Sequence, residues 1–263
     1  IWKTFNRCVT VHGTNQAVVS GNICYNHLGH GYFLEDGIEH GNTIEGNLGI
    51  LARTPVSGEQ VLASDMRPAT FWITNPANTY NGNVAAGSMG AGFWIALPLH
   101  PTGLSTTDAV WPRRTPFTQF TNNKAHSNRS TGMNIDDGPK TDGTTEVTYY
   151  DPRVDPTNSS SPASVTSFDH YTAYKNRGRG AWMRGANLRL THALLADRRQ
   201  GFPIYALRRA IRLCLPALAA VSVSALLYCA VHHDGPWPAP HSWLGLTSWT
   251  APPTVQEIAR PSL

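Results

Sequence analysis

Residues 17–47 read AVVSGNICYNHLGHGYFLEDGIEHGNTIEGN, and the second half of this stretch begins to repeat the first. The phrase V-x-G-N at residues 19–22 returns as I-x-G-N at residues 44–47, and related phrases follow three more times downstream. Recurrence of this kind is typical of a solenoid, in which each repeat forms one turn of the chain. The rest of the sequence can therefore be aligned on this phrase.

Three columns of the alignment each have a constant character: an anchor that is mostly Asn, a bulky apolar position three residues earlier, and a small position two residues later. The anchors are Asn22, Asn47, Asn83, Asn123 and Tyr171; the bulky column is Val19, Ile44, Tyr80, Phe120 and Phe168; the small column is Cys24, Gly49, Ala85, Ala125 and Ala173. We expect both apolar columns to point inward and to stack from coil to coil.

A short apolar run completes each repeat, as in YFL at residues 32–34, FWIT at 71–74 and FWI at 93–95. Short strands separated by Gly and Asn bury their apolar face only by stacking on neighbouring coils. The pattern predicts an all-β chain folded as a parallel β-helix of about five to six coils. Its winding should be right-handed, as parallel crossovers generally are.

The charge distribution gives no sign of a nucleic-acid partner. The formal net charge is +4, but residues 1–196 carry 15 Lys and Arg against 14 Asp and Glu, and the remaining residues carry 6 against 3. The repeat region is thus nearly neutral and has no basic patch.

The four cysteines are Cys8, Cys24, Cys214 and Cys229. Cys24 falls in the small inward column, so we expect it to be a buried small apolar residue, not a disulfide partner or a metal ligand. No Cys and His spacing of the zinc-site type is present. The chain begins at Ile1 without Met or signal peptide, which is typical of a fragment.

The repeat pattern stops near Asp197, which predicts a β-helix domain at residues 1–197 and a divergent, irregular or helical tail at 198–263. Residues 213–231, LCLPALAAVSVSALLYCAV, carry no charge and have the length of a membrane span. Three interpretations remain open: a membrane anchor, a helical cap or core segment, and a tail that a shifted reading frame or a wrong join has added.

Polar insertions at residues 53–68, 99–116 and 138–165 interrupt the coils. Insertions this long in a compact solenoid are usually functional walls or lids. Because all three flank the same strand of the coil, we expect them to border one groove.

Strand alternation predicts an outward column of mostly aromatic residues next to this groove. Its members are Phe33, Trp72, Trp94, Asn134 and Trp182, and beside them lie Glu35, Asp136 and Arg184. An aromatic ladder bordered by carboxylates suits a chain of sugar rings, whose apolar faces stack on the aromatics. The alternative, that the insertions cover the aromatics, stays open.

The candidate catalytic residues are Glu35, Asp36 and Asp136, and the candidate substrate-binding residues are Phe33, Trp72, Trp94, Trp182, Arg184, His30 and His40. Glu35 and Asp136 lie three coils apart, roughly 14 Å, which exceeds the roughly 5 to 9.5 Å between cooperating glycosidase carboxylates. Asp136 and Arg184 are one coil apart and could form an ion pair, which would equally be a simple surface contact. Asp-Gly pairs such as the one at Asp36 also commonly mark a turn.

Four acidic residues of the third insertion, Asp142, Glu146, Asp151 and Asp155, are candidate ligands of a calcium ion. Their spacing fits no EF-hand loop.

Four segments carry a resemblance to a known family: NRCVTVHGTN at residues 6–15, GHGYFLEDGIEHGNTIEGNLG at 29–49, ATFWITNPANTYNGNVAAGS at 69–88 and TAYKNRGRGAWMRG at 172–185. They resemble the β-helix region of the cell migration-inducing and hyaluronan-binding protein, the cell-surface transmembrane hyaluronidase and the fibrocystin-like proteins. The resemblance covers roughly residues 2–197. It implies a secreted or cell-surface β-helix and, for the hyaluronidase branch, calcium-dependent endo-type cleavage of hyaluronan.

Two functions therefore compete. The leading hypothesis is a carbohydrate-active β-helix that binds and cleaves a hyaluronan-like polysaccharide. Its rival is a non-catalytic adhesion or receptor module, since fibrocystin-like proteins are not known as enzymes. A purely structural spike or tether would need neither the outward aromatics nor the acidic cluster.

Overall fold

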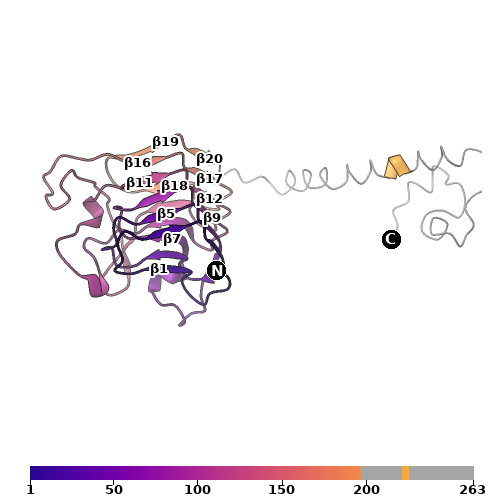
Figure 1. Ribbon diagram of the computed structural model, residues 1–263, viewed down its shortest axis with the longest axis horizontal. Helices are drawn as coiled ribbons and strands as arrows, with labels where there is room; N and C mark the ends of the chain where they lie inside the picture. The colour runs from indigo at the N-terminus through magenta and orange to yellow at the C-terminus, as the bar shows by residue number, and fades with distance from the viewer. Residues whose placement is uncertain (197–220, 225–263) are drawn as a thin grey trace, which may run out of the picture. The chain divides into compact units, whose positions relative to one another are not determined.

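Figure 1 shows the computed structural model, which describes residues 1–196 and 221–224. The chain divides into two units, Ile1–Arg199 and Gln200–Leu263. In the second unit residues 221–224 are helical, and the rest of the predicted segment 213–231 lies outside the described residues. Where the structure is described, no helix has both the length and the apolar character that crossing a membrane requires.

The described part of the first unit is built on three parallel sheets of six strands each, and each coil contributes one strand to each sheet. The third insertion adds a two-stranded antiparallel sheet, β14 (Gly138–Pro139) with β15 (Thr145–Glu146). Sheet I contains β1 (Val9–Val11), β4 (Tyr32–Leu34), β7 (Ala69–Ile73), β10 (Ala91–Ile95), β13 (Met133–Ile135) and β18 (Ala181–Met183). Sheet II contains β2 (Val18–Ser20), β5 (Thr43–Glu45), β8 (Thr79–Asn81), β11 (Gln119–Thr121), β16 (Thr166–Asp169) and β19 (Leu188–Thr191). Sheet III contains β3 (Ile23–Leu28), β6 (Leu48–Arg53), β9 (Val84–Ala86), β12 (Lys124–His126), β17 (Thr172–Tyr174) and β20 (Leu194–Ala196).

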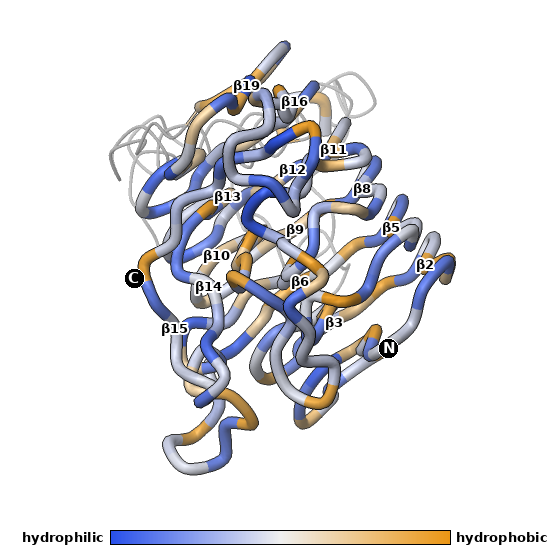
Figure 2. Tube along the Cα trace, turned by 90° about the vertical axis from the view of Figure 1, so that its left-hand side faces the viewer, coloured by the Kyte–Doolittle hydropathy of each residue, from blue (hydrophilic) through white to orange (hydrophobic). Residues whose placement is uncertain are grey.

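The predicted columns stack in register. In sheet II, Val19 pairs with Ile44, Ile44 with Tyr80, and Tyr80 with Phe120. Figure 2 shows β2, β5, β8 and β11 following one another along one side of the coil stack. The predicted parallel β-helix of five to six coils is thus confirmed, and its right-handed sense stays a prediction.

Asparagine side chains bind the turns of neighbouring coils together. The backbone N–H of Asn47 donates to Oδ1 of Asn83 at 3.1 Å, and the backbone N–H of Asn83 donates to Oδ1 of Asn123 at 3.0 Å. Nδ2 of Asn83 donates to the carbonyl of Ile44 at 2.7 Å. Asn42 with Asn78 and Asn128 with Asn176 repeat the arrangement at the other turns. The four anchor asparagines, from Asn22 to Asn123, therefore form a hydrogen-bonded ladder that satisfies turn amides.

The residue before each anchor has a positive φ. Gly21, Gly46 and Gly82 take this position in the first coils, with φ of 67°, 60° and 65°. Glycine adopts this left-handed conformation without the steric cost that a Cβ imposes. The repeated Gly-Asn phrase is thus a turn signal in which Gly makes the bend and Asn binds the neighbouring coil.

Aromatic rings fill the interior. Tyr32, Phe71 and Phe93 stack on one another along the axis, with ring centroids 4.7 Å apart in both pairs. Phe120 packs edge-on against Phe168 at 5.3 Å and Phe93 at 5.4 Å, and all of these side chains are buried. This cluster is the continuous core that stacking of coils creates.

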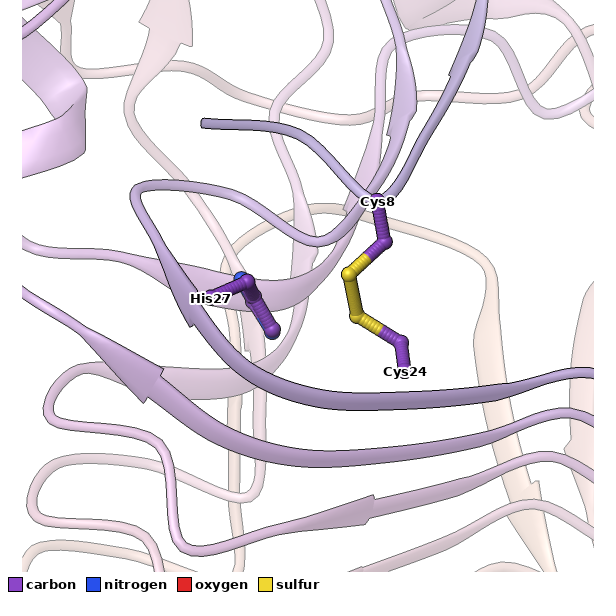
Figure 3. Close-up of side chains that lie close together, drawn as sticks. All are labelled: Cys8, Cys24 and His27. Atoms are coloured by element: carbon purple, nitrogen blue, oxygen red, sulfur yellow. A yellow bond between two sulfur atoms is a disulfide. The ribbon is translucent and has the colours of Figure 1, made fainter. Parts of the chain in front are cut away.

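The prediction that Cys24 is buried is confirmed, and the prediction that it forms no disulfide is wrong. Cys24 is fully buried, but it forms a disulfide with Cys8, with the two Cα atoms 6.0 Å apart (Figure 3). Cys8 directly precedes β1 and Cys24 lies in β3 of the same first coil, so the disulfide links two strands of one coil inside the β-helix. His27 lies beside the disulfide, and neither of its ring nitrogens has a hydrogen-bond partner. Burial lowers the pKa of His27 to about 4, which keeps the ring neutral.

We expect Phe120→Ala to lower the free energy of unfolding by about 3 to 5 kcal/mol, because it leaves a cavity in the interior aromatic cluster. Urea denaturation followed by circular dichroism measures the change. Leu104→Ala is the control, since Leu104 is 94% exposed and its truncation should change stability by less than about 0.5 kcal/mol. Equal effects of the two substitutions would contradict the packing described here.

We expect Asn83→Ala to cost more stability than Asn22→Ala, because Asn83 lies mid-ladder with bonds to coils on both sides and Asn22 is the partly exposed end. Each buried group left without a partner costs about 1 to 3 kcal/mol. The same urea titration compares the two variants. Equal stability of both would show that the ladder does not hold the turns.

Candidate functional site

A cleft of about 410 Å³ opens on the outer face of sheet I. Its floor includes Trp94, Asn134 and Trp182 from successive strands. Arg67 of the first insertion and Val147 of the third lie at its walls. Two of the three insertions therefore border one groove, as expected.

The second insertion lies elsewhere, so the expectation that all three insertions border the cleft was wrong. It contains two short 3-10 turns, η2 (Gly103–Ser105) and η3 (Pro112–Arg114). It packs over Asp36: the hydroxyl of Ser105 donates to Oδ2 of Asp36 at 2.9 Å, and the N–H of Thr102 donates to the Asp36 carbonyl at 2.9 Å.

Asp136 is the most fully bonded carboxylate in the cleft. Its Oδ2 accepts from Nε1 of Trp182 at 2.9 Å and from Nε of Arg184 at 2.7 Å, which confirms the predicted pairing with Arg184. Its Oδ1 accepts from the backbone N–H groups of Asp137 at 2.9 Å and Thr148 at 3.2 Å. Asp136 therefore fixes the positions of Trp182 and Arg184.

The electrostatics of Asp136 disfavour its candidate catalytic role. Burial raises the pKa of this carboxyl, but the hydrogen bonds from Trp182, Arg184 and the two backbone amides outweigh that effect and lower the pKa below its usual value. A general acid needs the opposite shift, a pKa raised towards neutrality. The geometry fits a permanently ionised positioning residue.

Guanidinium groups lie on the aromatic rings of the cleft. Arg67 lies over the ring of Trp94 at 5.0 Å, and Arg179 lies over the ring of Trp182 at 4.5 Å. Arg67 also faces Asp137 at 3.5 Å. Arg179 is exposed, and none of the salt bridges within residues 1–196 includes it. Arg179 is thus a cation free to meet an anionic ligand.

The aromatic column is in register but mostly covered. Phe33 pairs with Trp72, Trp72 with Trp94, and Asn134 with Trp182, as the alignment predicts. Phe33, Trp72 and Trp94 are nevertheless only 1–2% exposed, because they form a second hydrophobic cluster that Leu62 of the first insertion packs against. The expected continuous stacking ladder is therefore wrong, and Trp182 alone of its aromatic members is partly exposed.

His30 is buried beneath the first insertion and does not reach the surface. It is fully buried, its Nδ1 accepts the N–H of Ala69 at 3.0 Å, and its Nε2 faces Oγ of Ser64 at 3.0 Å. Ser64 and Asp65 lie in η1 (Ala63–Met66) of the first insertion, where Asp65 pairs with Arg7. Burial, followed by the charge of Arg7, holds the pKa of His30 well below its usual value. A neutral His30 thus fastens the insertion to β7, and the predicted substrate contact is wrong.

Glu35 and Asp36 meet a histidine that the sequence analysis missed. Nδ1 of His12 lies 3.1 Å from Oε2 of Glu35 and 3.6 Å from Oδ2 of Asp36. His12 directly follows β1, where Val11 pairs with Leu34, so it stacks beside Glu35. The signal was available, because extending the alignment one coil backwards places His12 there. This cluster lies three coils from Asp136 and is separate from the cleft.

The nearby Glu39 and His40 do not join the cluster of His12, Glu35 and Asp36. Glu39 is fully buried and accepts the backbone N–H groups of Gly13, Asp36 and Gly37. The exposed ring of His40 bonds to the carbonyl of Ile38 at 3.0 Å.

The four acidic residues of the third insertion are engaged separately. Asp142 accepts from Thr144, Glu146 pairs with Arg113, Asp151 pairs with Arg153, and Asp155 accepts from Thr157. Within the described part of the chain, no grouping of three potential metal ligands includes any of them. Separated in this way, they do not form the oxygen cage that calcium requires.

Comparisons with known proteins agree with this architecture. The family model described as "CEMIP beta-helix" matches residues 1–133. The cell surface hyaluronidase CEMIP2 of Homo sapiens is 35% identical over 233 residues, which cover 75% of this chain and 17% of that protein. The cell migration-inducing and hyaluronan-binding protein of Mus musculus is 35% identical over 235 residues, with the same coverage. Fibrocystin-L of Homo sapiens is 41% identical over 133 residues, which cover 51% of this chain and 3% of that protein.

The chain spans only 17% of the length of the first two relatives, so the match concerns one region of much longer proteins. The family model covers the first coils with their Gly-Asn turns and the first two insertions. The chain therefore belongs to the CEMIP β-helix family.

Proposed function

We propose that this β-helix binds an acidic polysaccharide of the hyaluronan type in the cleft beside Trp182. The observation that carries the proposal is the grouping of three guanidinium groups in one cleft. Arg179 and Arg184 lie over the partly exposed indole of Trp182, and Arg67 lies over the neighbouring, buried Trp94. Only two carboxylates, Asp136 and Asp137, balance them within the cleft.

The chemistry of such a ligand matches this arrangement. A sugar ring presents an apolar face that packs on indole, as apolar groups generally do on aromatic surfaces. A uronate carboxylate accepts two parallel hydrogen bonds from a guanidinium group, and the planar fork of Arg179 is free to donate them. Asn134 and Thr131 add neutral hydrogen-bonding groups for hydroxyls and amides.

The relatives support the same ligand class. One is named a cell surface hyaluronidase and another a hyaluronan-binding protein. As part of the proposal, this chain binds the same class of ligand. It also acts at the cell surface or outside the cell.

Cleavage is the second candidate function, and the cluster of His12, Glu35 and Asp36 favours it. An imidazole 3.1 Å from one carboxylate and 3.6 Å from another has the composition of a general acid–base site. Ser105 holds Asp36 in place, while Glu35 and His12 remain open to solvent with side-chain exposures of 36% and 45%. Glu35 and Asp36 thus keep their candidate catalytic roles, with His12 added.

For binding, we expect Arg179→Ala and Trp182→Ala each to weaken retention on immobilised hyaluronan by about tenfold, which corresponds to ~1.4 kcal/mol. Arg177→Ala is the matched control, because Arg177 is an exposed arginine near Arg179 that does not line the cleft. Added NaCl should weaken retention of the wild type, since salt screens exposed charges. Retention of both cleft variants at the level of Arg177→Ala would contradict the proposed cleft.

For cleavage, we expect the wild type to shorten hyaluronan and Glu35→Gln or His12→Gln to slow it by about 10²- to 10⁴-fold while retention stays unchanged. Gel sizing of hyaluronan, with and without calcium, measures the reaction. Glu146→Gln, which changes a carboxylate outside both sites, serves as the control. Full-length hyaluronan after incubation with the wild type would exclude cleavage by this chain and leave the binding proposal to its own assay.

A further inference from the structure

A second cluster of ionisable side chains lies at the turn between sheets II and III, on the last two described coils. Nδ1 of His170 lies 2.7 Å from Oδ2 of Asp169, and Nδ1 of His192 lies 2.7 Å from Oδ1 of the same carboxylate. The two imidazole rings stack with centroids 4.6 Å apart and an interplanar angle of 22°. One carboxylate therefore holds two parallel imidazoles.

The strand register fixes this arrangement. Asp169 at the end of β16 pairs with Thr191 at the end of β19, so the residues that follow them occupy the same turn position on neighbouring coils. That position is the left-handed one filled by Gly or by Asn122 in earlier coils, and His170 and His192 both adopt it with φ of 49°. The spacing of the rings thus follows from the rise of the helix, about 4.8 Å per coil.

We propose that Asp169, His170 and His192 form a binding site for a divalent transition-metal ion of the Zn²⁺ type. One nitrogen of each ring and one carboxylate oxygen lie within 4.8 Å of one another. Two imidazole nitrogens and one carboxylate suit Zn²⁺, Ni²⁺ or Cu²⁺, whereas Ca²⁺ prefers oxygen ligands alone.

The rest of the site is suited to receive an ion. Thr191 donates its hydroxyl to Oδ1 of Asp169 at 2.7 Å, a contact of the kind that orients metal-ligating carboxylates. His170 and His192 are exposed, and Asp169 is partly exposed, so an ion can enter from solvent and complete its coordination with water. Binding replaces the Nδ1 contacts to Asp169, and each neutral ring then carries its proton on Nε2.

Such an ion would link two coils that only hydrogen bonds and packing otherwise join. The site is distinct from the cleft, which lies on the outer face of sheet I, and from the cluster of His12, Glu35 and Asp36 at the first coils. The third grouping with suitable ligands, Cys8, Cys24 and His27, is closed by the disulfide.

The test titrates Zn²⁺ by calorimetry into the 263-residue chain after treatment with EDTA. His170→Asn and His192→Asn are the informative variants, because Asn122 shows that Asn fits the same turn with φ of 56°. Each should weaken Zn²⁺ binding by about tenfold or more, since even outer-shell partners contribute about 10- to 100-fold. Zn²⁺ should also raise the unfolding temperature of the wild type and not that of the double variant.

Two control variants make the result specific. His126→Asn removes a surface histidine that stacks on Tyr174, and His12→Asn removes the histidine of the other solvent-open grouping. Both should bind Zn²⁺ as the wild type does. The proposal is overturned if the wild type binds no Zn²⁺, if His170→Asn and His192→Asn keep its affinity, or if only His12→Asn loses it.

Discussion

The backbone amides at the turns of each coil are buried, and the rest of the structure depends on how they are satisfied. Strand pairing cannot reach them, so asparagine side chains supply the missing acceptors and donors from the next coil, as Asn47, Asn83 and Asn123 do. A buried amide without a partner is costly, which makes this contact obligatory. Because each Asn binds a set position on its neighbour, the ladder also holds the register between coils.

Fixed register explains which parts of the fold the sequence could predict. The bulky and small columns follow from one repeated phrase, and Val19, Ile44, Tyr80 and Phe120 stack as the alignment requires. The disulfide escaped prediction because Cys8 precedes the first repeated phrase, so no column predicted a partner for it. The role of the Asn ladder was also missed, since recurrence marks a position without stating its hydrogen bonds.

In the candidate site, too, contacts that follow the coil repeat could be predicted, and contacts made by the insertions could not. The pairing of Asp136 with Arg184 follows from the one-coil spacing, and His12 could have been placed beside Glu35 by the same argument. The cover of Trp72 depends on how the first insertion packs, and the pKa of Asp136 depends partly on the backbone of Thr148 in the third. Insertions obey no repeat, so their contacts are visible only in three dimensions.

Each insertion begins where a strand of sheet I or sheet III ends. None of them interrupts the short Gly-Asn turn between sheets II and III. Natural variation can therefore lengthen, shorten or recharge an insertion without disturbing the ladder at that turn. A duplicated coil would likewise bring its own Asn and remain compatible with its neighbours. The ladder thus makes the fold evolvable: ligand preference can diverge among relatives in the loops over sheet I while the skeleton beneath stays the same.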